Sequence, residues 1–147
     1  RDDPMLEKIK EIESSKNQNK KPLKTPYVPT SIGELIDKIS ILEIKMEKLA
    51  DTKNVDKELR ALNNTLTNLN INIKTKLISS LRTVNRELWK IEDDIRECER
   101  LKEFNENFIR LARSVYVKND ERASIKREIN FTYSSGIIEE KSYKEFY

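Results

Sequence analysis

The chain has 147 residues, of which 37% are charged, 36% are hydrophobic, two are Gly and four are Pro, and its formal net charge is +3. This length fits one domain, or one domain with an arm. The composition is typical of long amphipathic helices and poor for a sheet sandwich, whose many turns use Gly and Pro. A net charge this small does not imply a nucleic-acid partner.

The residue types that are scarce or missing narrow the chemistry further. The chain has no His, which removes the commonest general base and most zinc sites, and we predict no metal or other cofactor. The single cysteine, Cys98, excludes a disulfide within the chain, which either favours a reducing compartment or carries no information about the compartment. No window approaches 18 apolar residues, so we expect no membrane insertion and a cytoplasmic location.

Residues 1–29 are predicted to form a helical and basic N-terminal arm with its linker. Asp3-Pro4 is a favourable helix start, and Met5, Leu6, Ile9 and Ile12 follow at helical spacing over about ten residues. From Ser14 to Thr30 the chain is polar and rich in Lys and Pro. The run Lys16–Lys24 carries four Lys and no acid, which we interpret as a solvated linker rather than a phosphate-binding arm.

Residues 30–147 are predicted to form one helical domain. Ser31 and Glu34 have the spacing of a capping box, in which each side chain bonds a backbone amide near the other. The helix that follows, to about Ala50, carries an apolar stripe that three extra isoleucines widen, so we expect it to be buried on more than one side. Asn54 is placed to cap the next helix.

The segment Leu77–Leu101 has the longest apolar stripe, and we expect the rest of the chain to be organised around it. Its stripe is Leu77, Leu81, Val84, Leu88, Ile91, Ile95 and Cys98. These steps of four and three place the residues on one helix face, which needs a neighbouring segment or a second copy to cover it. Alternating asparagines at 68–72 predict a kink or short break before this helix. A continuous helix over 54–102 stays open as the alternative.

A last helical segment follows Phe104-Asn105, with Asn105 as its cap. We expect Asn119-Asp120 to interrupt it, and we expect Ser134-Ser135-Gly136 to end it, with Gly136 in the left-handed conformation. The short tail after Glu139 carries three aromatic residues that are expected to pack back.

Two acidic groups are candidates for a magnesium site. Glu92, Asp93 and Glu97 lie close together on the central helix, and Glu34 and Asp37 form a second pair. Two such groups on neighbouring helices could hold Mg²⁺. We favour the simpler interpretation, that these are charges on helix surfaces.

One corner of the chain is a candidate anion site. Arg122, Lys126 and Asn130 lie in one row at i, i+4 and i+8, and a turn at Asn119-Asp120 would fold this row toward the preceding helix. The alternative is a salt-bridged structural corner that uses nearby carboxylates. The candidate anion-binding residues are Arg113, Tyr116, Asn119, Asp120, Arg122, Lys126 and Asn130.

Four stretches taken together resemble a bacterial and phage family of unknown function, number 6165 among such domains. They are TSIGELIDKISILEIKMEKL (30–49), VNRELWKIEDDIR (84–96), FIRLARSVYVKNDERASIKREIN (108–130) and IIEEKSY (137–143). The family brings no established activity. What the resemblance implies is a setting near sugar-transferring and surface-polysaccharide machinery, which is an association and not a mechanism.

These observations predict an all-α fold, an antiparallel helical bundle with a long central helical hairpin. The function that we expect is a non-catalytic helical interaction or assembly domain that forms a homo-oligomer and could also bind another protein. No catalytic residue is predicted. The alternative is a small helical enzyme or ligand-binding domain for a phosphorylated metabolite or nucleotide sugar.

Overall fold

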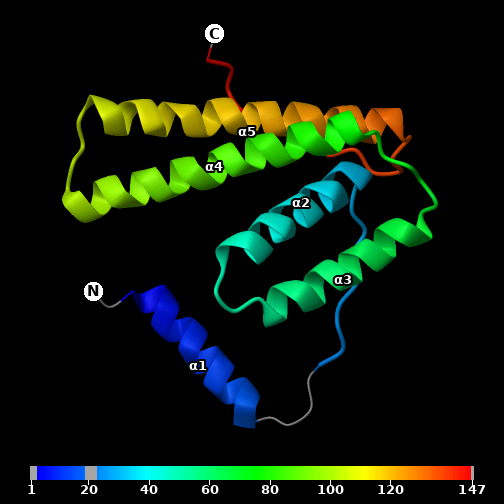
Figure 1. Ribbon diagram of the computed structural model, residues 1–147, viewed down its shortest axis with the longest axis horizontal. Helices are drawn as coiled ribbons and strands as arrows, with labels where there is room; N and C mark the ends of the chain where they lie inside the picture. Colours follow the sequence, from blue (N-terminus) through cyan, green and yellow to red (C-terminus); the bar gives the residue numbers. More distant parts are fainter. Residues whose placement is uncertain (1–2, 19–22, 147) are drawn as a thin grey trace.

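The computed structural model describes residues 3–18 and 23–146, in which the chain forms five helices (Figure 1). The helices are α1 (Pro4–Gln18), α2 (Ile32–Lys48), α3 (Lys53–Asn68), α4 (Thr75–Leu101) and α5 (Glu106–Thr132). The described residues contain no strand, which confirms the all-α prediction. None of these helices is both long enough and apolar enough to cross a membrane.

Helix α2 lies at the centre of the bundle. It contacts α3, α4 and α5, whereas α3 contacts α2 alone among the helices. Apolar residues occur on most sides of α2, and Leu35, Ile36, Ile39, Leu42 and Ile44 are all buried. The prediction that this helix is buried on more than one side is therefore confirmed, although we had expected α4 to be the organising element.

Helices α4 and α5 form the long antiparallel hairpin (Figure 1). Each has 27 residues and is therefore about 40 Å long at roughly 1.5 Å per residue. The α4 stripe is buried within the chain at Leu77, Leu81, Val84, Leu88 and Cys98. The core joins part of this stripe to Ile36 of α2 and Ile129 of α5. The free thiol of Cys98 acts here as a small buried hydrophobic group.

The break predicted before α4 is present, because α3 ends at Asn68 and α4 begins at Thr75. Asn70 adopts a positive φ of 53° in this connection, a conformation that Asn tolerates better than most residues. The predicted cap at Asn54 is wrong, since α3 begins one residue earlier. The carboxylate of Asp51 accepts a hydrogen bond of 3.1 Å from the amide of Lys53.

Two predictions about α5 are also wrong. The helix runs without interruption through Asn119-Asp120, where tertiary contacts outweigh the weak helix propensity of Asn and Asp. On either side of this point, Lys118 pairs with Glu87 of α4 at 2.5 Å, and Asp120 pairs with Lys141 of the tail at 2.8 Å. The left-handed residue after the helix is Ser134, with φ of 52°, and no glycine of the described chain has a positive φ.

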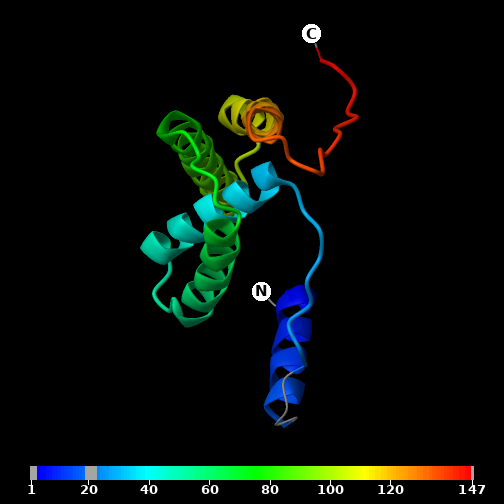
Figure 2. The ribbon, with the colours of Figure 1, turned by 90° about the vertical axis from the view of Figure 1, so that its right-hand side faces the viewer.

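Helix α1 lies apart from the other four helices (Figures 1 and 2). It has no contact with any of them, and residues 23–30 follow an irregular, extended course to α2. The tail after α5 lies to one side of that helix (Figure 2). It turns back along α5, because its residues Glu140 and Lys141 pair with Arg127 and then Asp120 of the helix. Its Phe146 ring meets the Tyr116 ring edge to face at 5.0 Å.

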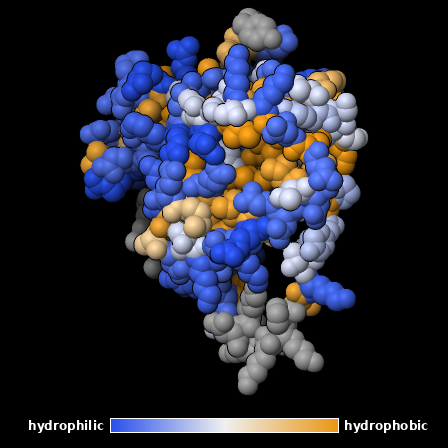
Figure 3. Space-filling view, turned by 45° about the vertical axis from the view of Figure 1, so that its right-hand side comes forward, coloured by the Kyte–Doolittle hydropathy of each residue, from blue (hydrophilic) through white to orange (hydrophobic). Residues whose placement is uncertain are grey.

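The apolar core reaches the surface at one end of the bundle, which we call the open end and define by Ile32, Leu66, Ile71 and Tyr133. These residues are only partly buried while they pack against the core. The hydroxyl of Tyr133 accepts a hydrogen bond of 2.6 Å from the amide of Lys74, which ties the end of α5 to the start of α4. Figure 3 shows an apolar area on the face that includes this end of the molecule.

Candidate functional site

The candidate site begins where α2 starts against α5. Ser31 caps α2 by accepting a hydrogen bond of 3.0 Å from the amide of Glu34, as predicted. The amide of Gly33 donates to Oδ1 of Asn130 at 2.6 Å. A Cβ atom at Gly33 would lie 2.5 Å from the carbonyl oxygen of Lys126, so glycine is required here for close helix approach.

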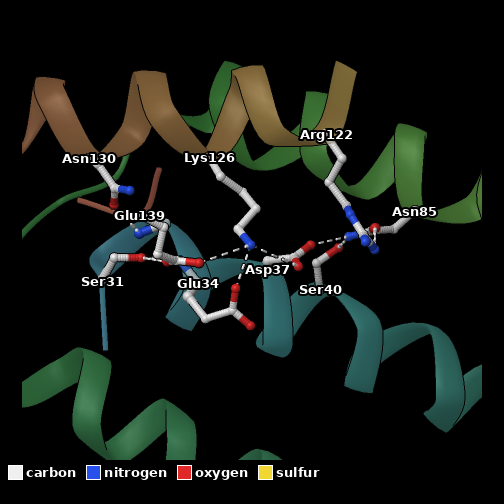
Figure 4. Close-up of polar contacts among 10 residues, drawn as sticks. Ser31, Glu34, Asp37, Ser40, Asn85, Arg122, Lys126, Asn130 and Glu139 are labelled. Carbon is white, nitrogen blue, oxygen red and sulfur yellow. Dashed lines mark hydrogen bonds and ion pairs between the residues drawn. The ribbon is translucent and has the colours of Figure 1, made fainter. Parts of the chain in front are cut away.

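Lys126 of α5 lies among three carboxylates (Figure 4). Its ammonium group pairs with Glu34, and it lies 3.8 Å from carboxylate oxygens of Asp37 and of Glu139. The Glu34 side chain therefore faces α5 and does not complete the predicted capping box. Glu139 of the tail also accepts a hydrogen bond from the Ser31 hydroxyl, so the tail is fastened to the start of α2.

A second set of contacts joins α2 to α4 and α5. The amide nitrogen of Asn85 donates to Asp37 at 2.8 Å and to Ser40 at 3.3 Å. The guanidinium group of Arg122 donates to the amide oxygen of Asn85 at 3.4 Å. Asp37 is only 4% exposed, so these bonds replace the water that its carboxylate would otherwise hold.

Together these groups form a polar network whose first purpose is structural. It comprises Ser31, Glu34, Asp37, Ser40, Asn85, Arg122, Lys126, Asn130 and Glu139 (Figure 4). In this network three carboxylates face two cations, Arg122 and Lys126. A buried network of this kind fixes which helix faces meet and in which register.

The acidic residues considered for magnesium do not come together. Glu34 and Asp37 are engaged by Lys126, while Glu92 and Asp93 are exposed on α4. Glu97 binds Arg100 at 2.6 Å, and this hydrogen bond lowers the pKa of the Glu97 carboxyl. Over residues 3–18 and 23–146 we find no group of three or more His, Cys, Asp or Glu residues arranged to hold a metal ion.

A groove lies between α5 and the tail, and we call it the tail groove. Its volume is about 870 Å³. Six of the seven residues predicted for an anion site line it, and these are Tyr116, Asn119, Asp120, Arg122, Lys126 and Asn130. Arg113 does not line it. Since α5 is continuous, the predicted turn at Asn119-Asp120 is absent, and that part of the predicted site is wrong.

The charges that line the tail groove are mostly paired. Besides the contact of Lys126 with Glu139, Arg127 pairs with Glu140 at 3.1 Å and Lys141 pairs with Asp120 at 2.8 Å. These three pairs use every carboxylate of the lining. Arg122 and Lys144 also line the groove, and neither has a carboxylate partner among the described residues.

The sequence interpretation missed the tail as a wall of the site. Glu139, Lys141 and Tyr143 belong to the IIEEKSY stretch, and the signals that pointed to it were its similarity to the family and the expectation that the tail aromatics pack back. It also missed Asn85, which follows the core residue Val84 in α4 and is itself buried. A polar residue at such a position predicts a buried hydrogen bond but does not identify the partner.

Comparison with curated proteins and with solved structures finds no match to this chain. A family model, described as a family of unknown function, matches residues 27–146. This range contains α2–α5, the polar network and the tail groove, and it leaves out α1. It agrees with the likeness that we placed from residue 30 onward. The chain therefore belongs to this family of unknown function, DUF6165.

Proposed function

We propose that the chain is a non-catalytic helical interaction domain that self-associates by exchanging α1 between two copies. The observation that carries the proposal is the uncovered stripe of α1. Met5, Leu6, Ile9 and Ile12 are between 46% and 68% exposed, and no other helix contacts them. A helix of 15 residues is marginal in water without a docking surface, so its apolar face requires a partner.

The stripes of α4 and α5 are not the interface in this proposal. They cover each other within one chain, as the burial of Leu81, Leu111 and Ile129 indicates. Self-association is therefore assigned to α1 and to whatever apolar surface receives it.

We assign the receiving surface to the open end of a second copy. The arm leaves the bundle at Ser31, beside Ile32 of the open end, so two copies that face each other across a two-fold axis can exchange arms over a short distance. Pro26 and Pro29 favour an extended connection, which disfavours reversal of α1 onto its own bundle. The thirteen residues 19–31 can span up to about 45 Å.

An assembly role is consistent with the polar network. Its acids and bases are paired with one another and connect α2, α4, α5 and the tail, which is what a structural scaffold requires. The resemblance to proteins near sugar-transferring machinery supplies a setting in which such a domain would hold partners together.

The test is the molar mass of the full chain in solution. By light scattering at tens of micromolar, we expect a dimer for the natural sequence and a monomer for Ile9→Glu, because the charge would be buried without a partner. Ser14→Glu is the matched control, since it adds the same charge to α1 away from the stripe, and it should remain dimeric. A natural chain that is monomeric at these concentrations contradicts the proposal.

A further inference from the structure

The tail groove has the size and the walls of a ligand site. Its volume of about 870 Å³ lies within the range of small-molecule sites, roughly 300–1,000 Å³. One wall is α5, and the other is the tail, which is held by the ion pairs of Glu140 with Arg127 and of Lys141 with Asp120. The tail is therefore held in place as one wall of this groove.

Two cations in this groove are available to a ligand. The described contacts of Arg122 include one hydrogen bond, from Nη1 to the uncharged amide of Asn85, so its other donors are unused. Lys144 has no partner among the described residues. Since all three carboxylates of the lining are already paired, these two charges favour an anion.

Asn130 supplies a neutral donor at the same wall. This residue is 2% exposed, and its Oδ1 accepts from the Gly33 amide, which can only donate. That bond fixes the orientation of the side-chain amide. Its Nδ2 group is then left without an acceptor among the described residues, while the residue lines the groove.

The spacing along α5 limits the shape of the ligand. Arg122 and Asn130 lie about 12 Å apart along the helix axis, and Tyr116 lies about 9 Å beyond Arg122 in the other direction, at roughly 1.5 Å per residue. One phosphate does not bridge donors that far apart as readily as two linked phosphates. The Tyr116 and Phe146 rings provide an aromatic surface at the far end of the same groove.

We propose that the tail groove binds a nucleoside diphosphate, with the phosphates between Arg122 and Asn130, Lys144 at the rim, and the base against Tyr116 and Phe146. The aromatic end of the groove suits the flat base of the ligand, and the two unpaired cations suit the negative charge of its phosphates. The lining of this groove includes no residue of α1 and none of the four residues that define the open end.

Isothermal titration calorimetry on the full chain tests the site with ADP and UDP. We expect saturable binding of at least one of them, and binding at least about tenfold weaker for pyrophosphate and for the nucleoside alone, since each lacks one half of the contacts. No binding of ADP or UDP at millimolar concentration overturns the proposal. Pyrophosphate that binds as tightly as the nucleoside diphosphate also overturns it.

Substitutions of the lining residues test whether the ligand binds in the tail groove. Lys144→Gln and Arg122→Gln should each weaken binding about tenfold or more, as expected for loss of a charge-assisted hydrogen bond. Lys144 forms no hydrogen bond or ion pair with the described residues, so its variant should keep the melting temperature. Arg113→Gln is the control, because it removes the same charge from α5 outside the groove. If Arg113→Gln weakens binding as much as Lys144→Gln does, the assignment to the groove is wrong.

Discussion

Helices α1 and α4 carry the same kind of apolar stripe with opposite outcomes. Met5, Ile9 and Ile12 repeat in steps of four and three, as Leu77, Leu81 and Val84 do, yet the first set is exposed and the second is buried. The difference lies in the connections. A four-residue link returns α5 along α4, whereas a proline-containing segment leads away from α1. A stripe therefore predicts that a helix needs a partner, and the connection decides whether the partner is in the same chain.

The largest effect is expected from a charge in the buried stripe. Leu88→Asp places a carboxylate in the buried stripe of α4, where Leu88 is 9% exposed. We expect the free energy of unfolding to fall by more than about 3 kcal/mol, because the charge is removed from water without a counter-ion. Urea unfolding followed by circular dichroism measures this change.

The same type of substitution in α1 tests whether its stripe differs from the buried stripe of α4. Ile9→Asp should leave the free energy of unfolding of α2–α5 nearly unchanged when it is measured at a protein concentration low enough to keep the chain monomeric. A loss comparable to that of Leu88→Asp would mean that α1 packs on its own bundle.

A medium effect is expected at the crossing of α2 and α5. Gly33→Ala brings a methyl group against the backbone carbonyl of Lys126, so α2 has to shift, and we expect a loss of about 1–3 kcal/mol in the free energy of unfolding. Gly136→Ala is the matched control, since no atom lies within 4 Å of a Cβ there, and it should change little. Equal effects of the two substitutions would contradict the close approach.

The smallest effect concerns acid and the pair that joins α2 to α4. The hydrogen bond from Arg86 lowers the pKa of Glu47 in the folded chain. A depressed pKa contributes stability that is present above the ordinary pKa of Glu, about 4.3, and is lost as the pH falls through the lower folded value. Glu47→Gln should therefore slightly reduce the loss of stability between pH 5 and pH 2, in a series of urea unfolding curves, relative to the natural chain.

Glu97 supplies the comparison for that measurement. Its pKa is also lowered, by Arg100 three residues further along α4, but this pair lies within one helix turn. A local pair can persist in residual helix of the unfolded chain, so Glu97→Gln should change the pH dependence less than Glu47→Gln. A larger change for Glu97→Gln would contradict the importance of the link between helices.

Much of the fold could be predicted from the sequence because its helix signals are local. Ser31 and Asn105 cap the helices that they were predicted to cap, and the asparagines near residue 70 mark a real break. The continuity of α5 through Asn119 could not be predicted, since contacts with other segments override the local preference there. The central position of α2 likewise depends on which helices pack together.

Only the α5 side of the candidate site could be predicted from the sequence. Spacing correctly placed Arg122, Lys126 and Asn130 in one row of α5. The partners of this row are Glu34 and Asp37, which were also noted as a pair, but nothing local indicates that the two groups meet across a helix crossing. The tail lacks any helical period, so its position against α5 depends on ion pairs that become evident only in the folded chain.

The hydrogen bond from Ser31 to Glu139 has a consequence for the order of folding. These residues stand at the two ends of the bundle's sequence, 108 positions apart, and their side chains bond directly. During synthesis α2 emerges before α3, α4 and α5, whereas the carboxylate that fastens its first turn emerges after all of these helices. The nascent chain can form its helices one after another, but the start of α2 is not secured until the tail leaves the ribosome. The first turn of α2 is thus fixed only after all the helices of the bundle have been synthesised.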